Sequence, residues 1–223
     1  MLRERLIDGE CPGPYQVLAA DLSGDGKQDL LVTCPGKGLI QWYQAPTWKK
    51  RAIRSDLRPG ALDFAAYDLD GDGELELAVI DEFDLGKTRT GGRILWLDRG
   101  KSLDEEWSVY PIDAIPTAHR IRWASLDGRR KQLVVAPILG EGADPAKPRD
   151  VAASLVYYRI PEDPRKGPWE RHTIDRQLPL QHGIQIRDVD GDGRDEILSA
   201  SAAGTNLFHA RIEDGELRFT KQL

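Results

Sequence analysis

Three stretches of the chain place oxygen-bearing side chains at alternating positions, with glycines between them: residues 21–29, 68–76 and 188–196. In each stretch these side chains stand at positions 1, 3 and 5, an acid stands at position 9, and glycines occupy positions 4 and 6. Glycine permits the positive φ angles of a tight curl, so the oxygens can face one concavity. Calcium binds about six to eight such hard oxygens. We therefore predict Ca²⁺ as the cofactor, with about three sites.

The predicted ligands are the side chains at positions 1, 3, 5 and 9 and the backbone carbonyl at position 7. They are Asp21, Ser23, Asp25, Asp29 and the carbonyl of Lys27; then Asp68, Asp70, Asp72, Glu76 and the carbonyl of Glu74; then Asp188, Asp190, Asp192, Glu196 and the carbonyl of Arg194. Because Ser23 replaces a carboxylate, we expect the first site to be the weakest. A shortened fourth copy at residues 125–132 keeps only Asp127, so we expect it to bind no metal.

Two other interpretations of the loops fail. An EF-hand needs a bidentate Glu at position 12 and a helix on each side. Position 12 is Val32, Val79 and Ser199 here, and the flanking segments are apolar or alternating, which is typical of strands. A single Asp-Gly pair would indicate only a turn. Three copies with an acid at position 9 favour a metal site.

The elements that must position these loops repeat with them. An apolar strand precedes each loop, a second follows it, a third ends in aromatic residues, and a fourth is polar and ends in Ile or Leu. Four-stranded repeats of about 40–50 residues are typical of β-propeller blades. We predict an all-β single domain over residues 1–223, with blades at about 9–55, 56–113, 114–176 and 177–223, and an extra outer strand at residues 5–8. Either four blades close a ring, or the chain is a segment of a larger one.

A second set of reactive residues lies at the other end of the blades. In this architecture the strand before each loop is innermost, and its start opens at the central channel, opposite the metal loops. Six residues before position 1 stand Tyr15, Leu62, His119 and His182, with Arg120 beside His119. Histidine can transfer protons and arginine can neutralise a carboxylate or enolate. Tyr15, His119, Arg120 and His182 are therefore the candidate catalytic residues. His119 and His182 could also ligate a transition metal. The remaining alternative is that these are polar residues merely satisfied at strand starts.

The three loops, followed by Leu-Leu-Val, Leu-Ala-Val and Ile-Leu-Ser, resemble the FG-GAP/VCBS repeat family, which is related to the propeller of integrin α-subunits. The resemblance covers nearly the whole chain and implies a calcium-stabilised, usually secreted propeller of about seven blades. It leaves the function open, because the family includes adhesion modules, polysaccharide lyases and a sugar dehydratase. Residues 116–123, 135–140 and 158–164 are also similar to the propeller of aldos-2-ulose dehydratase-like proteins, whose cupin domains are absent here.

Composition limits the partners. The 223 residues are 40% hydrophobic and 30% charged, with a formal charge of −6 that three Ca²⁺ ions would cancel. A nucleic-acid binder should show a basic face, and none is evident. No apolar run approaches the roughly 20 residues that span a bilayer, so we expect no membrane insertion. Cys11 and Cys34 either pair or remain free thiols.

Calcium loops of this kind suit the millimolar calcium found outside the cytosol, so we expect an extracellular or periplasmic protein. The first residues lack the apolar core of a signal peptide, hence either a leader has been removed or the chain begins inside a longer precursor. Three functions stay open: a module that binds carbohydrate or protein, a carbohydrate-active lyase or dehydratase, and a purely structural domain. Whether the chain is an enzyme is left undecided.

Overall fold

The computed structural model describes residues 3–100 and 102–222. The limits predicted for the domain, Met1 and Leu223, lie outside these residues. The described chain contains sixteen strands, one short 3₁₀ turn at Pro35–Lys37 and no α-helix. No helix among these residues is long and apolar enough to cross a membrane.

The strands form four separate antiparallel sheets of four strands each, and within every sheet the strands stand in chain order. The first sheet holds β1 (Val17–Ala20), β2 (Asp29–Cys34), β3 (Leu39–Gln44) and β4 (Lys49–Arg54); the second holds β5 (Asp63–Tyr67), β6 (Glu76–Asp81), β7 (Arg93–Asp98) and β8 (Ser108–Ala114); the third holds β9 (Ala118–Ala124), β10 (Gln132–Pro137), β11 (Ala153–Arg159) and β12 (Glu170–Leu178); the fourth holds β13 (Gly183–Arg187), β14 (Glu196–Ser201), β15 (Gly204–Glu213) and β16 (Glu216–Gln222). The prediction of an all-β chain of four-stranded blades is confirmed.

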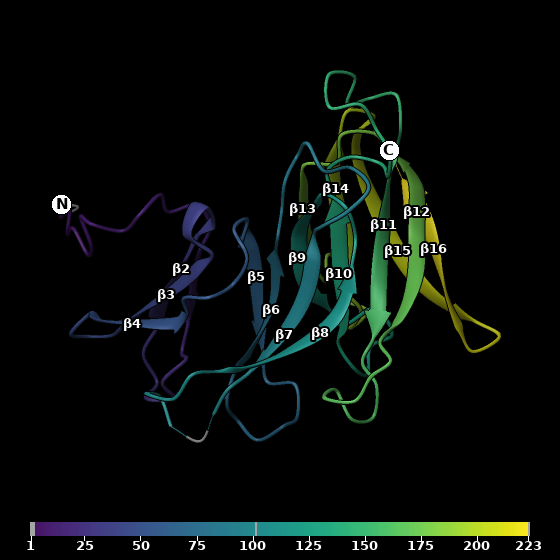
Figure 1. Cartoon of the computed structure of the whole chain (residues 1–223). Coiled ribbons are helices and arrows are strands. Elements are labelled where there is room, and N and C mark those ends of the chain that lie inside the picture. Colours follow the sequence, from purple (N-terminus) through teal and green to yellow (C-terminus); the bar gives the residue numbers. More distant parts are fainter. Residues whose placement is uncertain (1–2, 101, 223) are drawn as a thin grey trace.

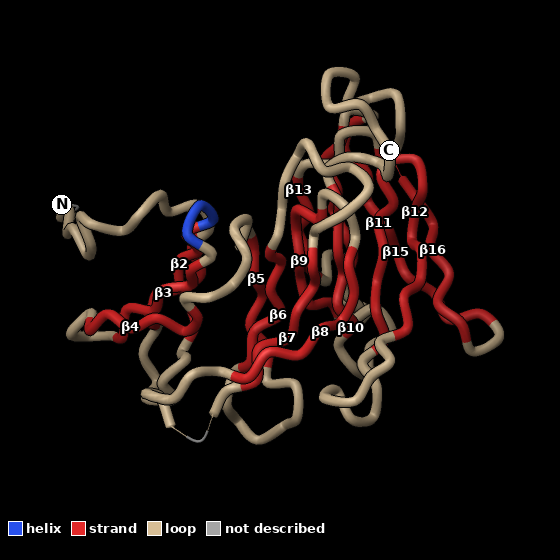
Figure 2. Tube along the Cα trace, in the orientation of Figure 1, coloured by secondary structure: helices blue, strands red, loops and turns tan. Residues whose placement is uncertain are grey.

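The four sheets follow one another across the molecule (Figure 1). The inner strands β5, β9 and β13 pack against one another, and in the described residues no strand pairing joins one sheet to the next. Figure 2 shows strands through the body of the molecule and loops at both ends of the sheets. The first sheet stands apart from the fourth in Figure 1, so the arrangement is open, as in a segment of a ring.

The middle strands of the second and third sheets are buried on both faces because they contribute to two cores. Along β10, Leu133 and Val135 join the cluster between the second and third sheets, whereas Val134 and Ala136 join the cluster between the third and fourth. Side chains of a strand alternate between its two faces, which explains this division. The sheets are therefore held together by apolar packing between neighbouring blades.

The backbones of successive blades touch at two equivalent glycines. Gly38 precedes β3 and Gly92 precedes β7, both with positive φ (59° and 64°). A Cβ atom at Gly38 would lie 1.9 Å from the carbonyl oxygen of Leu57, and one at Gly92 would lie 1.9 Å from that of Ile115. Only glycine fits at these two contacts.

The N-terminal segment departs from the prediction. Residues 3–16 contain no strand, so the extra outer strand predicted at residues 5–8 is wrong. The segment is held by side chains instead: Asp8 accepts hydrogen bonds from Tyr43 Oη (2.7 Å) and Lys50 Nζ (2.6 Å). Cys11 and Cys34 are free thiols whose Sγ atoms lie 3.2 Å apart.

Candidate functional site

The four candidate catalytic residues come together at one end of the inner strands. Tyr15 Oη lies 3.4 Å from His119 Nε2, and Arg120 Nη2 donates to Tyr15 Oη at 3.3 Å. The rings of His119 and His182 have centroids 4.8 Å apart. Phe83 packs on the other side of His119, at 5.5 Å between centroids. We call this group the histidine mouth (Tyr15, Phe83, His119, Arg120 and His182). His119 and Arg120 lie on β9 of the third sheet, and the other three lie in loops next to strands of the first, second and fourth sheets.

The two histidines of the mouth differ in burial. His119 is 3% exposed, and its Nδ1 atom is buried without a hydrogen-bond partner among the described residues, whereas His182 is exposed. Burial, helped by the positive charge of Arg120, lowers the pKa of His119 to about 3. His119 therefore stays neutral near pH 7 and is suited to hydrogen bonding. His182, which solvent can reach, is the better placed of the two to exchange a proton with a ligand.

A cavity of about 550 Å³ opens beside the mouth. Tyr15, Leu62 and Phe83 line it with apolar surface, and Arg58, Lys87, Glu82 and Asp84 line it with charges of both signs. Of the mouth residues, Tyr15 and Phe83 line the cavity, whereas His119, Arg120 and His182 do not. Leu62 occupies the position in the second blade that Tyr15, His119 and His182 occupy in the others. Apolar walls with a few convergent polar groups are the usual form of a small-molecule site.

Asp63, next to Leu62 in sequence, does not belong to the mouth. It is fully buried and accepts hydrogen bonds from the backbone N–H of Ile121 (3.1 Å) and from Arg122 Nη1 (2.8 Å). Burial raises the pKa of Asp63, although Arg122 and the Ile121 amide oppose that rise. Asp63 instead ties β5 of the second blade to β9 of the third.

The predicted metal loops lie at the opposite end of the inner strands, and two of them share one set of hydrogen bonds. Asp68 accepts from the N–H groups of Gly71 (2.7 Å) and Gly73 (3.0 Å), and Asp188 accepts from Gly191 and Gly193 at the same distances. The acid at position 9 accepts from the N–H at position 2: Glu76 from Leu69 at 2.7 Å and Glu196 from Val189 at 2.9 Å. These bonds preform each loop and turn its carboxylates toward a common centre.

Ligand atoms gather in three groups within the described residues. Within each group the candidate ligand atoms all lie within 4.8 Å of one another. The groups are Asp68, Asp70 and Glu76; Asp188, Asp190 and Asp192; and Asp190, Glu196 and His209. The 21–29 loop forms no such group of acids in the described residues, and Lys27 Nζ pairs with Asp25 there at 2.9 Å. Ser23 Oγ is buried without a partner among those residues, and Asp29 is fully buried and accepts from Ser23 and Ala45.

The 68–76 loop has the chemistry that a cation would satisfy. Burial raises the pKa of Glu76 to about 7, and the neighbouring charges of Asp70, Asp72 and Asp68 add to the rise. A bound divalent cation would offset this repulsion, and the donors are all oxygen, so the residues fit Ca²⁺. The side chains at position 7 have other partners: Glu74 pairs with Arg99 (3.0 Å), and Arg194 lies 3.9 Å from Asp192. The carbonyl ligands of Lys27, Glu74 and Arg194 stay predictions.

The 125–132 loop keeps the hairpin and loses the charge. Gln132, which is buried, accepts from the N–H of Leu126 at 2.8 Å, so a neutral amide makes the bond that Glu76 and Glu196 make in their loops. Arg129, Arg130 and Lys131 line the adjacent cavity of about 450 Å³. These positive charges would repel a cation, and the expectation that this loop binds no metal stays a prediction.

Sequence reasoning missed the roles of Gln132 and His209. Gln132 takes the place of the position-9 acid in a loop that is one residue shorter. His209 lies beside Glu196 on the neighbouring strand, because strand pairing fixes the register. Ile197 pairs with Phe208, and Leu77 pairs with Leu97, so the next pairs bring His209 beside Glu196 and Asp98 beside Glu76. Aligning the aromatic strands of the repeats would have placed these residues opposite position 9.

Comparisons with known proteins agree with this geometry. Residues 13–79 match the model of the FG-GAP-like repeat, and residues 91–219 match that of the aldos-2-ulose dehydratase β-propeller domain, which confirms both resemblances. Aldos-2-ulose dehydratase of Phanerodontia chrysosporium is 26% identical over 93% of this chain, which spans only 25% of that protein. The crystal structure of the exotype rhamnogalacturonan lyase YesX aligns with 94% of this chain and 47% of its own, at a TM-score of 0.50 and 17% identity, and so supports the fold alone.

Proposed function

The chain belongs to the aldos-2-ulose dehydratase β-propeller family, and from that premise we propose that it is a calcium-stabilised propeller that binds carbohydrate at the histidine mouth. The observation that carries the proposal is the convergence of Tyr15, His119, Arg120 and His182 beside a cavity of about 550 Å³. The relative that shares 26% identity with this chain is named for its action on an aldos-2-ulose, which is a sugar.

The mouth offers the contacts that a sugar needs. Tyr15 is 49% exposed and Phe83 lines the same cavity, so a pyranose ring has aromatic and apolar surface to lie on. Arg120 and His182 supply charged and polar groups for hydroxyl or carboxylate oxygens. A protein ligand remains the competing occupant of this face, and it would need far more surface than the cavity provides.

Binding is tested by calorimetry with an aldos-2-ulose and with rhamnogalacturonan fragments. Tyr15→Phe, Arg120→Gln and His182→Ala should each weaken binding by about tenfold, the effect of losing one hydrogen bond to a charged or polar partner. The matched control is His172→Gln, because His172 lies on the outer strand β12, where it stacks on Tyr157 and, in the described structure, contacts no residue of the mouth. Equal affinities for all four variants and the unchanged protein would refute a carbohydrate site at the mouth.

A second candidate function, elimination from a sugar, is favoured by the pairing of an exposed His182 with a neutral His119 and a nearby Arg120. In a dehydration the base takes a proton from carbon, the neighbouring C–O bond breaks, and the protonated base returns the proton to the departing oxygen, which leaves as water. His182 is suited to take that proton, and Arg120 is suited to stabilise an enolate. Loss of turnover in His182→Ala with binding retained would support this candidate; no turnover by the unchanged chain would leave a binding module.

Calcium would be held by the carboxylates of the 68–76 and 188–196 loops and more weakly by those of the 21–29 loop. Each ion would neutralise clustered charge and stiffen the hairpin between the first and second strands of its blade. The melting temperature of the chelator-treated chain should rise by several degrees when millimolar Ca²⁺ is added. The double variant Asp70→Ala, Asp190→Ala should abolish this rise. Loops that need millimolar calcium favour an extracellular or periplasmic location. An unchanged melting temperature would reduce the loops to turns.

A further inference from the structure

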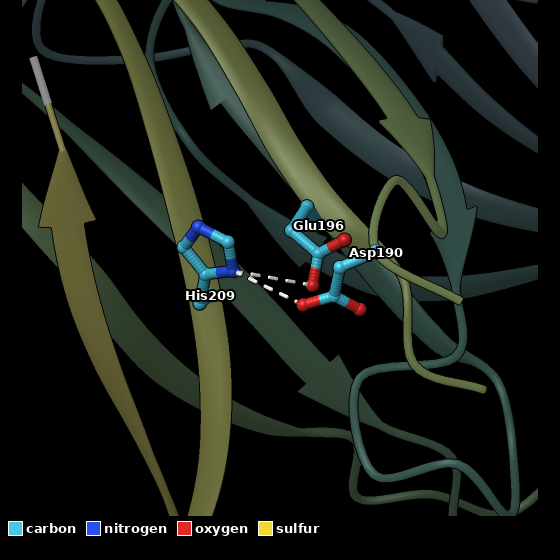
Figure 3. Close-up of side chains that lie close together, drawn as sticks. All are labelled: Asp190, Glu196 and His209. Atoms are coloured by element: carbon cyan, nitrogen blue, oxygen red, sulfur yellow. Dashed lines mark ion pairs between the residues drawn. The ribbon is translucent and has the colours of Figure 1, made fainter. Parts of the chain in front are cut away.

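The 188–196 loop differs from the other loops by a histidine that faces its acids. His209 Nδ1 lies 3.5 Å from Glu196 Oε1 and 4.0 Å from Asp190 Oδ2. Figure 3 shows the imidazole reaching from β15 toward both carboxylates. The three side chains come from three segments: the loop itself, the first residue of β14, and β15. The loop thereby divides into an all-oxygen group (Asp188, Asp190 and Asp192) and a mixed group that shares Asp190 with it.

Among the described residues no Lys or Arg side chain lies within ion-pair distance of Asp190 or Glu196, although Arg194 and Arg211 line the same cavity. At the equivalent place in the second blade, Asp98 binds Arg165 at 2.7 Å, and the same guanidinium lies 3.5 Å from Asp70. In the fourth blade, within the described residues, neither Asp190 nor Glu196 has an ion-pair partner other than His209. Two carboxylates and an imidazole therefore meet without a built-in positive charge, unless the imidazole is protonated.

Glu196 is buried and has one carboxylate oxygen without a hydrogen-bond partner among the described residues. Its side chain is 3% exposed; Oε2 accepts from Val189, but in the described chain Oε1 has no hydrogen bond and points at His209. Nε2 of His209 is buried and likewise has no partner among these residues, so no hydrogen bond fixes the imidazole tautomer and Nδ1 is free to present its lone pair. A cavity of about 300 Å³, lined by Asp190, Glu196 and His209, gives solvent ions access.

The donor set decides which ion fits. Ca²⁺ takes oxygen ligands, whereas imidazole with carboxylates suits Zn²⁺ and its transition-metal neighbours. Two metal–ligand bonds of about 2.1 Å at a tetrahedral angle place their ligand atoms about 3.4 Å apart. The distances of 3.5 and 4.0 Å from His209 Nδ1 are close to that value, so small side-chain rotations complete the geometry.

We propose that Asp190, Glu196 and His209 form a site for one divalent transition-metal ion of the Zn²⁺ type, beside the oxygen-only calcium site of the same loop. The three protein ligands leave a fourth position for water. The site lies at the loop end of the blade and does not depend on the carbohydrate proposal. It shares only Asp190 and Glu196 with the calcium ligands proposed above.

The test is a titration of the chelator-treated full chain with Co²⁺, followed by its visible absorption, and with Zn²⁺ by calorimetry, both in millimolar Ca²⁺. We expect one equivalent to bind. His209→Asn should weaken it by at least about tenfold, as loss of even an outer-shell partner does. The matched control is His172→Asn, which removes a histidine of the outer strand β12 that stacks on Tyr157 and should leave binding unchanged.

Three outcomes would overturn the site: cobalt binding that His209→Asn leaves intact, cobalt binding that the control substitution weakens as much as His209→Asn does, or cobalt binding that appears only when Ca²⁺ is left out. The circular dichroism spectrum of each variant checks its fold. The calcium-dependent rise in melting temperature, which also uses the 68–76 loop, should persist in His209→Asn. A failed cobalt titration with a retained calcium response would therefore refute this site and leave the calcium proposal standing.

Discussion

The two ends of the inner strands are built on different rules. At the loop end, three loops repeat one hydrogen bond: Leu69, Leu126 and Val189 donate from position 2 to Glu76, Gln132 and Glu196. At the other end the equivalent positions hold a tyrosine, a leucine and two histidines. A feature that repeats serves what every blade needs, namely a closed hairpin. The end that does not repeat is free to carry a site specific to this protein.

Gln132 sharpens that lesson. Because an uncharged amide closes the 125–132 hairpin, the position-9 side chain is first a hydrogen-bond acceptor for the loop and only second a metal ligand. The charge at Glu76 and Glu196 is thus an addition to a hairpin that forms without it. The predictions below separate the two roles, and they separate structure from ligand binding at the histidine mouth.

The largest effect is expected at Asp63, which lies near the mouth but serves the fold. Asp63→Ala leaves Arg122 and the Ile121 N–H without their buried acceptor. Breaking one side of such a buried pair costs about 3–5 kcal/mol. Urea unfolding of the variant measures this loss, and the double variant with Arg122→Ala should recover part of it. A loss below about 1 kcal/mol would mean that the blades are not tied here.

Glu76 tests the order of roles at the loop end. In chelator, Glu76→Ala should lower the free energy of unfolding by about 1–3 kcal/mol, because the partly buried N–H of Leu69 loses its acceptor. Glu76→Gln should largely keep the metal-free stability, as Gln132 does in its loop, and should lose most of the calcium increment. Unfolding curves with and without Ca²⁺ measure both effects. If the Gln and Ala variants were equally unstable in chelator, Gln at this position would not replace the hydrogen bond of Glu76 as Gln132 does in its own loop.

A smaller effect depends on pH at the mouth. The pKa of His119 is lowered to about 3 in the folded chain, against about 6.5 when unfolded. The unfolded chain therefore binds the proton more tightly, so His119 contributes stability above about pH 6.5 that is lost progressively as the pH falls toward 3. His119→Gln should flatten this part of the stability profile, measured by urea midpoints from pH 7 to 5. A parallel profile in the variant would show that His119 is not buried as described.

The smallest effect on stability is expected for Tyr15→Phe. The hydroxyl lies on a half-exposed ring at 3.3–3.4 Å from Arg120 and His119, so its loss should change the free energy of unfolding by less than about 0.5 kcal/mol. Carbohydrate binding should fall in the same variant. A variant that melts early and binds normally would reverse the assignment of the two ends.

Much of this architecture could be predicted from the sequence, since the acidic loops repeat and the alternation of strands is local. The convergence of Tyr15, His119 and His182 could also be predicted, because each stands six residues before position 1 of its loop. His209 could not be predicted because its place beside Glu196 depends on strand register, which a local pattern does not show. The role of Gln132 was missed because its loop is one residue shorter than the others. The strand expected at residues 5–8 failed because its polar pattern has no partner strand to pair with, and Asp8 holds the segment by its side chain.

The glycine contacts before β3 and β7 have a bearing on how far the molecule can be diversified. At Gly38 and Gly92 any larger residue would collide with a carbonyl of the following segment, so those turns must be left untouched in a mutant library. The mouth, in contrast, already holds three different residue types (Tyr, Leu and His) at one structural position of the four blades. A collection of variants randomised at residues 15, 62 and 182 would therefore alter the binding surface while conserving the joints between blades, which makes this chain a usable scaffold for selecting new sugar binders.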